Sequence, residues 1–218
     1  VSLGAALAFW HIGLKNETKN TNIDQMKGSY LGPEYTQYEI EEKLNDMGAL
    51  FKVFNEDALL EKTAEDLSNG DAVGWFQGRM EFGPRALGSR SILGDPRSTT
   101  MQKNLNLKVK YRESFRPFAP SVLFEDVSEW FQIKNDSPYM LFVVNVNNNK
   151  KINMTEEQTK LFGIDKLNVK RSDIPAVTHV DYSARIQTVH RNTNQKYYDL
   201  INKFKKKNWL SNPCKYFF

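Results

Sequence analysis

The run GRMEFGPRALGSR, residues 78–90, constrains the fold of this chain more than any other stretch. It holds three glycines and three arginines around Pro84. Glycine allows backbone conformations and close approaches that other side chains block, and proline stiffens a turn. The mostly apolar residues 72–76 come just before it. We therefore predict a buried strand that leads directly into an ordered loop.

Arginines recur in and just after this loop: Arg79, Arg85, Arg90 and Arg97. Guanidinium groups match the oxygens of phosphate or carboxylate, and like charges this close repel one another unless anions lie among them. We interpret the loop as an anion-binding loop that also presents backbone N–H groups. The alternative is that these arginines face water or pair with Glu81, Asp95 and Glu113.

A second basic segment, LKVKYRESFRPFAP, covers residues 107–120. Side chains alternate along an extended chain, which would place Lys110, Arg112 and Arg116 on one face. Aromatic residues lie between these cations and could cover an apolar or purine-like group. We predict a wall of basic and aromatic side chains, and the alternative is a positive strand edge that discourages aggregation.

Composition narrows the class of protein. A chain of 218 residues with 40% hydrophobic content can bury a substantial core. The net charge of +4 fits an anionic partner, and because the lysines are scattered, phosphate-bearing metabolites fit this charge as well as nucleic acid does. A single cysteine, Cys214, excludes a disulfide framework and favours a reducing compartment. The apolar run at 141–146 is far shorter than the roughly 20 residues of a membrane helix, so we expect a cytoplasmic protein without a membrane span.

Hydrophobic spacing predicts a mixed α/β fold with an open sheet. The predicted helices cover residues 4–14, 34–45, 58–67, 101–107, 125–131, 156–162 and 195–205. Asn55 or Asp57 is expected to cap the third of them. The predicted strands cover residues 51–54, 72–76, 121–124, 139–146, 176–180 and 185–189.

Four motifs carry a resemblance to a known family: QGRMEFGPRALGSRSILGDPRS, KYRESFRPFAPSVL, SPYMLFV and HVDYSARIQTV. They occur in that order, and the likeness runs from about residue 30 to residue 207. The chain resembles the C-terminal region of O-carbamoyltransferases of the NodU and CmcH type. Those enzymes carbamoylate hydroxyl groups on nodulation factors, cephalosporins and aminoglycosides.

The resemblance implies a two-domain enzyme. Its first domain is an actin-like ATPase-type domain with a histidine-bound iron site, and its second is a YrdC-like open, mixed, twisted sheet flanked by helices. We expect residues 1–15 to be the last helix of the first domain, 16–32 a linker and 33–207 the YrdC-like domain. Iron is expected only in the missing N-terminal domain, so no metal site is expected in this chain.

The resemblance also implies a reaction. The YrdC-like domain joins carbamoyl phosphate and ATP, with Mg²⁺, into carbamoyl adenylate, and the other domain passes the carbamoyl group to an acceptor hydroxyl. These anionic reactants must be aligned and their repulsion neutralised. By resemblance, Lys110 and Arg112 are the expected catalytic residues. The expected binding residues are Arg85, Arg116, Arg185, Arg79 and Arg90.

Other polar and aromatic residues receive structural interpretations. The three histidines, His11, His179 and His190, are too scattered for a metal site. We interpret His179 as a hydrogen-bonded structural residue, and the alternative is that it contacts substrate. Tyr182 stands where the resembled family usually has glycine, and we expect it to narrow the pocket. Aromatic residues expected in the core are Trp75, Trp130 and Phe131.

The final run, NWLSNPCKYFF at 208–218, departs from the family, which continues with a strand and an N-T-S-F-N segment. One choice of codons for it, read one base later, encodes TGYPILVNTSF, and the codons of Lys205–Lys207 form a run of adenines. We interpret 208–218 as a frameshifted tail that weakens adenylate formation. Two alternative functions stay open: a non-catalytic nucleotide- or RNA-binding module, and an inactive gene fragment.

Overall fold

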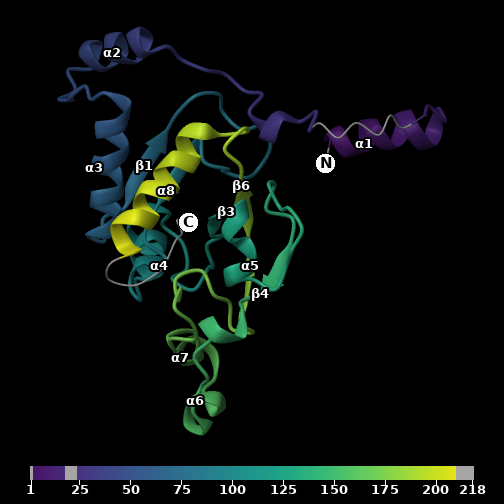
Figure 1. Ribbon diagram of the computed structural model, residues 1–218, viewed down its shortest axis with the longest axis vertical. Helices are drawn as coiled ribbons and strands as arrows, with labels where there is room; N and C mark the ends of the chain where they lie inside the picture. Colours follow the sequence, from purple (N-terminus) through teal and green to yellow (C-terminus); the bar gives the residue numbers. More distant parts are fainter. Residues whose placement is uncertain (1, 18–23, 210–218) are drawn as a thin grey trace.

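The computed structural model describes residues 2–17 and 24–209 (Figure 1). Its α-helices are α1 Ser2–Ala8, α2 Gln37–Asp46, α3 Glu56–Ser68, α4 Met101–Asn104, α5 Val127–Trp130, α6 Glu156–Lys160, α7 Gly163–Leu167 and α8 Gln195–Trp209. Short π- or 3₁₀-helical turns are η1 Phe9–Gly13, η2 Lys27–Ser29, η3 Leu105–Val109, η4 Phe124–Asp126 and η5 Asn148–Lys150. The strands are β1 Val73–Phe76, β2 Arg90–Leu93, β3 Ser121–Leu123, β4 Val143–Asn145, β5 Ser183–Arg185 and β6 Gln187–Val189. The mixed α/β class is confirmed.

Helix α1 and turn η1 form an arm that projects away from the rest of the molecule (Figure 1). This confirms the helix predicted at 4–14. Its apolar side chains are largely exposed, including Phe9 at 65% and Trp10 at 52%.

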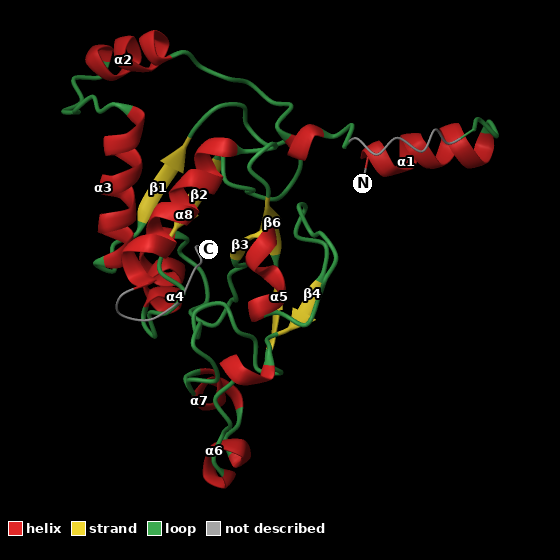
Figure 2. Ribbon diagram, in the orientation of Figure 1, coloured by secondary structure: helices red, strands yellow, loops and turns green. Residues whose placement is uncertain are grey.

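Helices α2 and α3 begin at side-chain caps. Thr36 and Glu39 form a capping box, in which the Glu39 N–H donates to Thr36 Oγ1 and the Thr36 N–H donates to Glu39 Oε2. Asn55 Oδ1 accepts the N–H of Ala58 at 2.8 Å, which confirms the predicted cap of α3. From this start α3 packs along α8 (Figure 2).

The described strands pair in three two-stranded sheets. β1 pairs antiparallel with β2, β3 pairs parallel with β6, and β4 pairs antiparallel with β5. The segment 183–189 therefore contacts β4 through its first half and β3 through its second, because Ile186 N–H donates to Phe142 O and Gln187 N–H donates to Pro120 O. Parallel and antiparallel pairing are mixed as predicted, but the described residues do not form one continuous open sheet.

Two groups of buried side chains make the core. Trp130 and Phe131 belong to the larger group, with the apolar side chains of β5 and of the turn at 174–177. Trp75 belongs to the second group, which joins β1, α3 and α8. These three aromatic residues are confirmed as core.

Two predicted strands are wrong and two elements were missed. Residues 51–54 alternate like a strand, but the chain there pairs with no described strand, and Val53 is 61% exposed. Residues 176–180 form no strand: Ala176 and Val177 lie in a buried turn, in which Ala176 N–H donates to Pro96 O and Val177 N–H to Ile174 O, and Val180 is 37% exposed. Strand β2 and helix α7 were not predicted; β2 is formed through pairing with β1, which local sequence does not encode. The predicted frameshifted tail lies outside the described residues, apart from positions 208 and 209 at the end of α8.

Candidate functional site

Four cationic side chains line one hollow of about 250 Å³: Arg85, Lys110, Arg112 and Arg185. We call it the cationic hollow. The four come from three separate segments, namely the loop after β1, the turn after η3, and β5. The other lining residues are Pro84, Ala86, Ser91, Ile92, Leu93, Pro117, Phe118, Ala119, Ser121, Met140, Gln187 and Tyr197. The structure thus brings together four of the residues that the sequence motifs single out, and their roles in binding stay a prediction.

The charges in the cationic hollow repel one another. Burial and the nearby Arg85 guanidinium hold the pKa of Arg185 below its ordinary value. Burial and Arg112 likewise lower the pKa of Lys110. Among the residues that the structure describes, the lining contains no aspartate or glutamate. An anion bound there would relieve this repulsion, so the hollow suits phosphate or carboxylate groups.

The remaining predicted arginines lie elsewhere. Arg79 pairs with Glu34, at 3.5 Å between Nε and Oε2, and Arg116 pairs with Glu113 at 2.9 Å. Arg90 lies 3.5 Å from the centre of the Phe76 ring and donates to backbone carbonyls. For these three the structure favours the alternative of ion pairing and structural contact over a place in the hollow.

The glycine-rich loop holds one of its own carboxylates. Glu81 is 4% exposed, and its Oε1 accepts the N–H groups of Leu87 at 2.7 Å, Ser89 at 2.7 Å and Arg90 at 3.2 Å. The expectation that the loop presents its N–H groups to a bound anion is therefore wrong at these three positions. The carboxylate satisfies the donors that the turn would otherwise leave buried and unpaired.

Asn106, in η3, organises the second basic segment. Its side chain is buried, its Oδ1 accepts Arg112 Nε at 2.6 Å, and its Nδ2 donates to Ser114 O and Arg116 O. Tyr111 has a left-handed backbone, with φ at 46°, so the chain turns sharply between Lys110 and Arg112. The expected extended alternation is therefore wrong here. Nothing local in the sequence marked Asn106, because its partners lie six to ten residues further along the chain.

A buried polar chain forms the floor of the hollow. Tyr197 Oη donates to Ser121 Oγ at 2.9 Å, Ser121 Oγ donates to Gln187 Oε1 at 2.9 Å, and Gln187 Nε2 donates to Leu87 O at 2.9 Å. Burial raises the pKa of Tyr197, which keeps its phenol protonated. Sequence reasoning missed these residues, although Ser121 and Gln187 stand inside the motifs that carry the family resemblance.

Tyr182 does not narrow the hollow, contrary to expectation. Its φ of 65° lies in the left-handed region, which explains why glycine suits this position. Its hydroxyl donates to Ile152 O at 3.1 Å, and the residue is absent from the lining of the hollow. The neighbouring His179 contacts Ser183 Oγ through Nδ1 at 2.9 Å, in agreement with a structural role, and burial lowers its pKa.

The described residues form neither a metal-binding cluster nor a membrane-spanning helix. Residues 2–17 and 24–209 contain no group of three histidine, cysteine, aspartate or glutamate side chains placed to hold a metal ion. In the same part of the chain, every helix is too short or too polar to cross a membrane.

Comparison with known proteins identifies the family. A model described as the carbamoyltransferase C-terminus matches residues 64–212, which include all four cations of the hollow. The chain belongs to the carbamoyltransferase C-terminal family. The chain is 56% identical over 205 residues to the uncharacterized protein sll1178 of Synechocystis sp., and the match covers 93% of this chain and 33% of that protein.

Two relatives with more informative names are also similar. Nodulation protein NolNO of Sinorhizobium fredii is 39% identical over 211 residues, covering 94% of this chain and 27% of the relative. The 3'-hydroxymethylcephem-O-carbamoyltransferase of Amycolatopsis lactamdurans is 36% identical over 138 residues, covering 63% of this chain and 22% of the relative. The chain therefore spans about a third or less of the length of these curated relatives.

Proposed function

We propose that this chain is the part of an O-carbamoyltransferase that binds carbamoyl phosphate and ATP and forms carbamoyl adenylate for transfer to an acceptor hydroxyl. The observation that carries the proposal is the convergence of Arg85, Lys110, Arg112 and Arg185 on one hollow, which no carboxylate of the described part of the chain lines. The YrdC-like arrangement implied by the resemblance belongs to the same proposal. Family membership and the name of the cephem O-carbamoyltransferase support it.

The size of the hollow favours a small anion. Pockets for drug-sized ligands occupy roughly 300–1,000 Å³. A volume of about 250 Å³ suits carbamoyl phosphate or its phosphate product more than a whole nucleotide. We therefore propose that the cations hold carbamoyl phosphate and the reacting phosphates, while the rest of ATP extends beyond this hollow.

The proposed reaction has two steps, hydrolysis of carbamoyl phosphate and adenylation of the carbamate that forms. Water attacks the carbonyl carbon of carbamoyl phosphate, the carbon–oxygen bond to phosphate breaks, and carbamate and phosphate form. A carbamate oxygen then attacks the α-phosphorus of ATP, and the bond between the α-phosphorus and the bridging oxygen breaks to release pyrophosphate. Lys110 and Arg112 are proposed to hold and neutralise the anionic oxygens, which is the main requirement of phosphoryl-type transfer.

The residues of the hollow do not fit a protein-held Mg²⁺ site. Magnesium is bound through carboxylate, phosphate and water oxygens, and within residues 2–17 and 24–209 no carboxylate lines the hollow. The Mg²⁺ expected with ATP would therefore be carried by the nucleotide, and no step is assigned to it.

Calorimetric titration of the 218-residue chain with carbamoyl phosphate tests the proposal. Arg112→Met removes a charged hydrogen-bond donor and is expected to weaken binding about 10- to 100-fold. Arg116→Met is the matched control, because this arginine lies outside the lining and pairs with Glu113. Equal losses in the two variants would contradict the proposed site.

Phosphorus NMR with carbamoyl phosphate and ATP tests the adenylate step. We expect phosphate and pyrophosphate release from a chain that carries TGYPILVNTSF at 208–218, and less or none from the present sequence. RNA binding that weakens steeply with salt, without ATP-dependent phosphate release, would instead favour a non-catalytic module. A melting temperature that neither reactant raises would favour an inactive fragment.

A further inference from the structure

The segment expected to be a linker runs along the glycine-rich loop at residues 78–90, which we call the arginine loop. We call residues 24–33 the strap. Gly32 N–H donates to Met80 O at 2.9 Å, and Met80 N–H donates to Pro33 O at 2.9 Å. This reciprocal backbone pairing joins the end of the strap to the loop just ahead of Arg85. The strap is thus paired with the loop that carries Arg85, outside the lining of the hollow.

Tyr30 makes the most specific contact of the strap. Its hydroxyl donates to Leu87 O at 2.7 Å and accepts Asn194 Nδ2 at 2.9 Å. Burial raises the pKa of Tyr30 to about 12, so the hydroxyl keeps its proton at neutral pH. Leu87 O also accepts Gln187 Nε2, from the floor of the cationic hollow. One carbonyl, two residues after Arg85, therefore connects the strap with the hollow.

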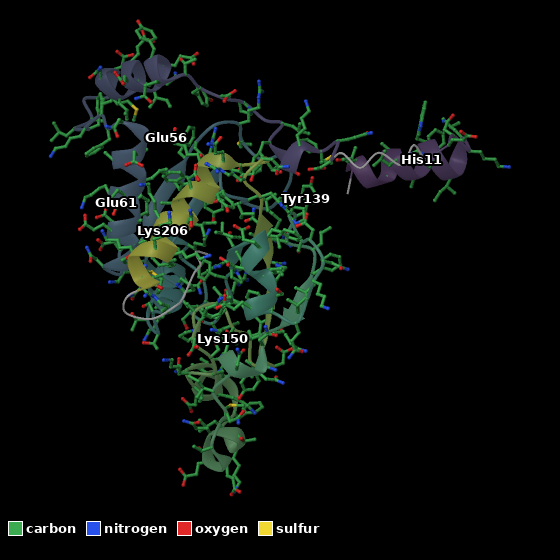
Figure 3. The ribbon with its side chains drawn as sticks, in the orientation of Figure 1. His11, Glu56, Glu61, Tyr139, Lys150 and Lys206 are labelled. Atoms are coloured by element: carbon green, nitrogen blue, oxygen red, sulfur yellow. The ribbon has the colours of Figure 1, made fainter. Side chains whose placement is uncertain are left out.

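The other end of the strap reaches the rim of the same hollow. Tyr139 Oη donates to Asp24 Oδ2 at 2.5 Å, and Asp24 also accepts the N–H of Gly28 at 2.8 Å. Tyr139 lies at the edge of the molecule next to the strap (Figure 3). The next residue, Met140, lines the hollow and has a left-handed φ of 53°.

The strap also fits too closely to shift freely. A Cβ atom added at Gly28 would lie 2.5 Å from Thr193 Cγ2 and 2.6 Å from the Tyr30 ring. Phe82 N–H donates to Ser29 O at 2.6 Å. A strap this tightly packed can hold the loop in one position.

We propose that Tyr30 is a positioning residue: through the Leu87 carbonyl, the strap fixes the loop that presents Arg85, and so sets the affinity of the cationic hollow for a phosphate-bearing anion, which under the proposed function is carbamoyl phosphate. The inference rests on the proposed function. Its distinctive content is that affinity depends on a hydroxyl that is absent from the lining of the hollow.

Tyr30→Phe tests the inference, because it keeps the ring and removes only the donor. Calorimetry should show carbamoyl phosphate binding weakened about 3- to 10-fold. Tyr38→Phe is the matched control, since Tyr38 is 73% exposed on α2, and it should bind like the unmodified chain. Tyr139→Phe removes the hydrogen bond to Asp24 at the other end of the strap and should also weaken carbamoyl phosphate binding. This variant replaces Tyr30→Phe as the test if Tyr30→Phe does not fold.

The readouts separate positioning from mere support. A lower melting temperature with an unchanged dissociation constant in Tyr30→Phe and Tyr139→Phe would overturn the inference. Titration with inorganic phosphate separates it from the proposed function. If the unmodified chain binds phosphate in a Tyr30-dependent way but ignores carbamoyl phosphate, the proposed function fails and the inference stands. If it binds neither anion, both fail.

Discussion

Replacing Gly88 with alanine is expected to destabilise the protein through two separate effects. Gly88 has φ at 99°, where a residue with a Cβ atom is strained. An added Cβ atom would also lie 2.3 Å from Cδ1 and 2.5 Å from Cε1 of Tyr197. The Tyr197 ring is 1% exposed and its hydroxyl is bound to Ser121, so the ring cannot move aside at low cost.

These effects set the expected magnitude. The left-handed conformation costs about 1–2 kcal/mol for a residue with a side chain. Overpacking of a filled core costs about 1–3 kcal/mol more. The free energy of unfolding should therefore fall by about 3 kcal/mol in Gly88→Ala, which lowers the melting temperature by roughly 6–12 °C in a chain of this size.

Urea unfolding followed by circular dichroism measures the loss, and two glycines supply controls. Gly48 has φ at 65° with no atom within 4 Å of an added Cβ, so Gly48→Ala isolates the conformational cost. The backbone of Gly74 does not have a positive φ, and an added Cβ atom there would also have no atom within 4 Å, so Gly74→Ala should change stability very little. A Gly88→Ala variant no less stable than Gly48→Ala would refute the packing argument. A Tyr197→Leu background should reduce the cost of Gly88→Ala if the ring is its cause.

Three further predictions follow from buried polar groups. Burial lowers the folded-state pKa of His179, so the unfolded chain binds the proton more tightly and the free energy of unfolding falls as pH drops below about 6.5. The His179→Gln variant should therefore lose less stability than the unmodified chain between about pH 7.5 and 5.5. Equal losses in urea unfolding would contradict this. Lys205 Nζ lies 2.7 and 2.9 Å from the two carboxylate oxygens of Asp126, so Lys205→Met should cost about 3–5 kcal/mol in thermal unfolding, and adding Asp126→Asn should recover part of that loss. Asn106→Ala removes the acceptor that orients Arg112 and should weaken carbamoyl phosphate binding about tenfold by calorimetry, whereas unchanged affinity would show that Arg112 needs no such support.

Local sequence signals predicted the elements that local interactions form. The cap at Asn55 is confirmed, because capping depends on residues within one turn, although α3 begins at Glu56, two residues before the predicted start. The alternating run at 51–54 misled, because a strand also needs a neighbour to pair with, and the described chain offers none there. Strand β2 was missed for the converse reason, since its pairing with β1 crosses the whole arginine loop.

The candidate site was predictable in part. Arg85 and Arg116 look alike in the motifs, yet only Arg85 lines the hollow. The sequence does not separate them, because Glu81 stands four residues before Arg85 just as Glu113 stands three before Arg116. In the structure Glu113 pairs with Arg116, whereas Glu81 binds backbone N–H groups of its own loop. No local signal marks Tyr30 either, whose partners Leu87 and Asn194 lie 57 and 164 residues away.

The Glu81 carboxylate inside the arginine loop has a consequence for anion binding in the cationic hollow. A turn closed around an internal anion needs no substrate to hold its shape. Under the proposed function, binding and release of a phosphate group change the charge balance at Arg85. The affinity is not reduced by an entropy cost of ordering the loop, because the loop is already ordered. Such a site would, under the same proposal, release its products quickly and keep the same geometry for the next molecule.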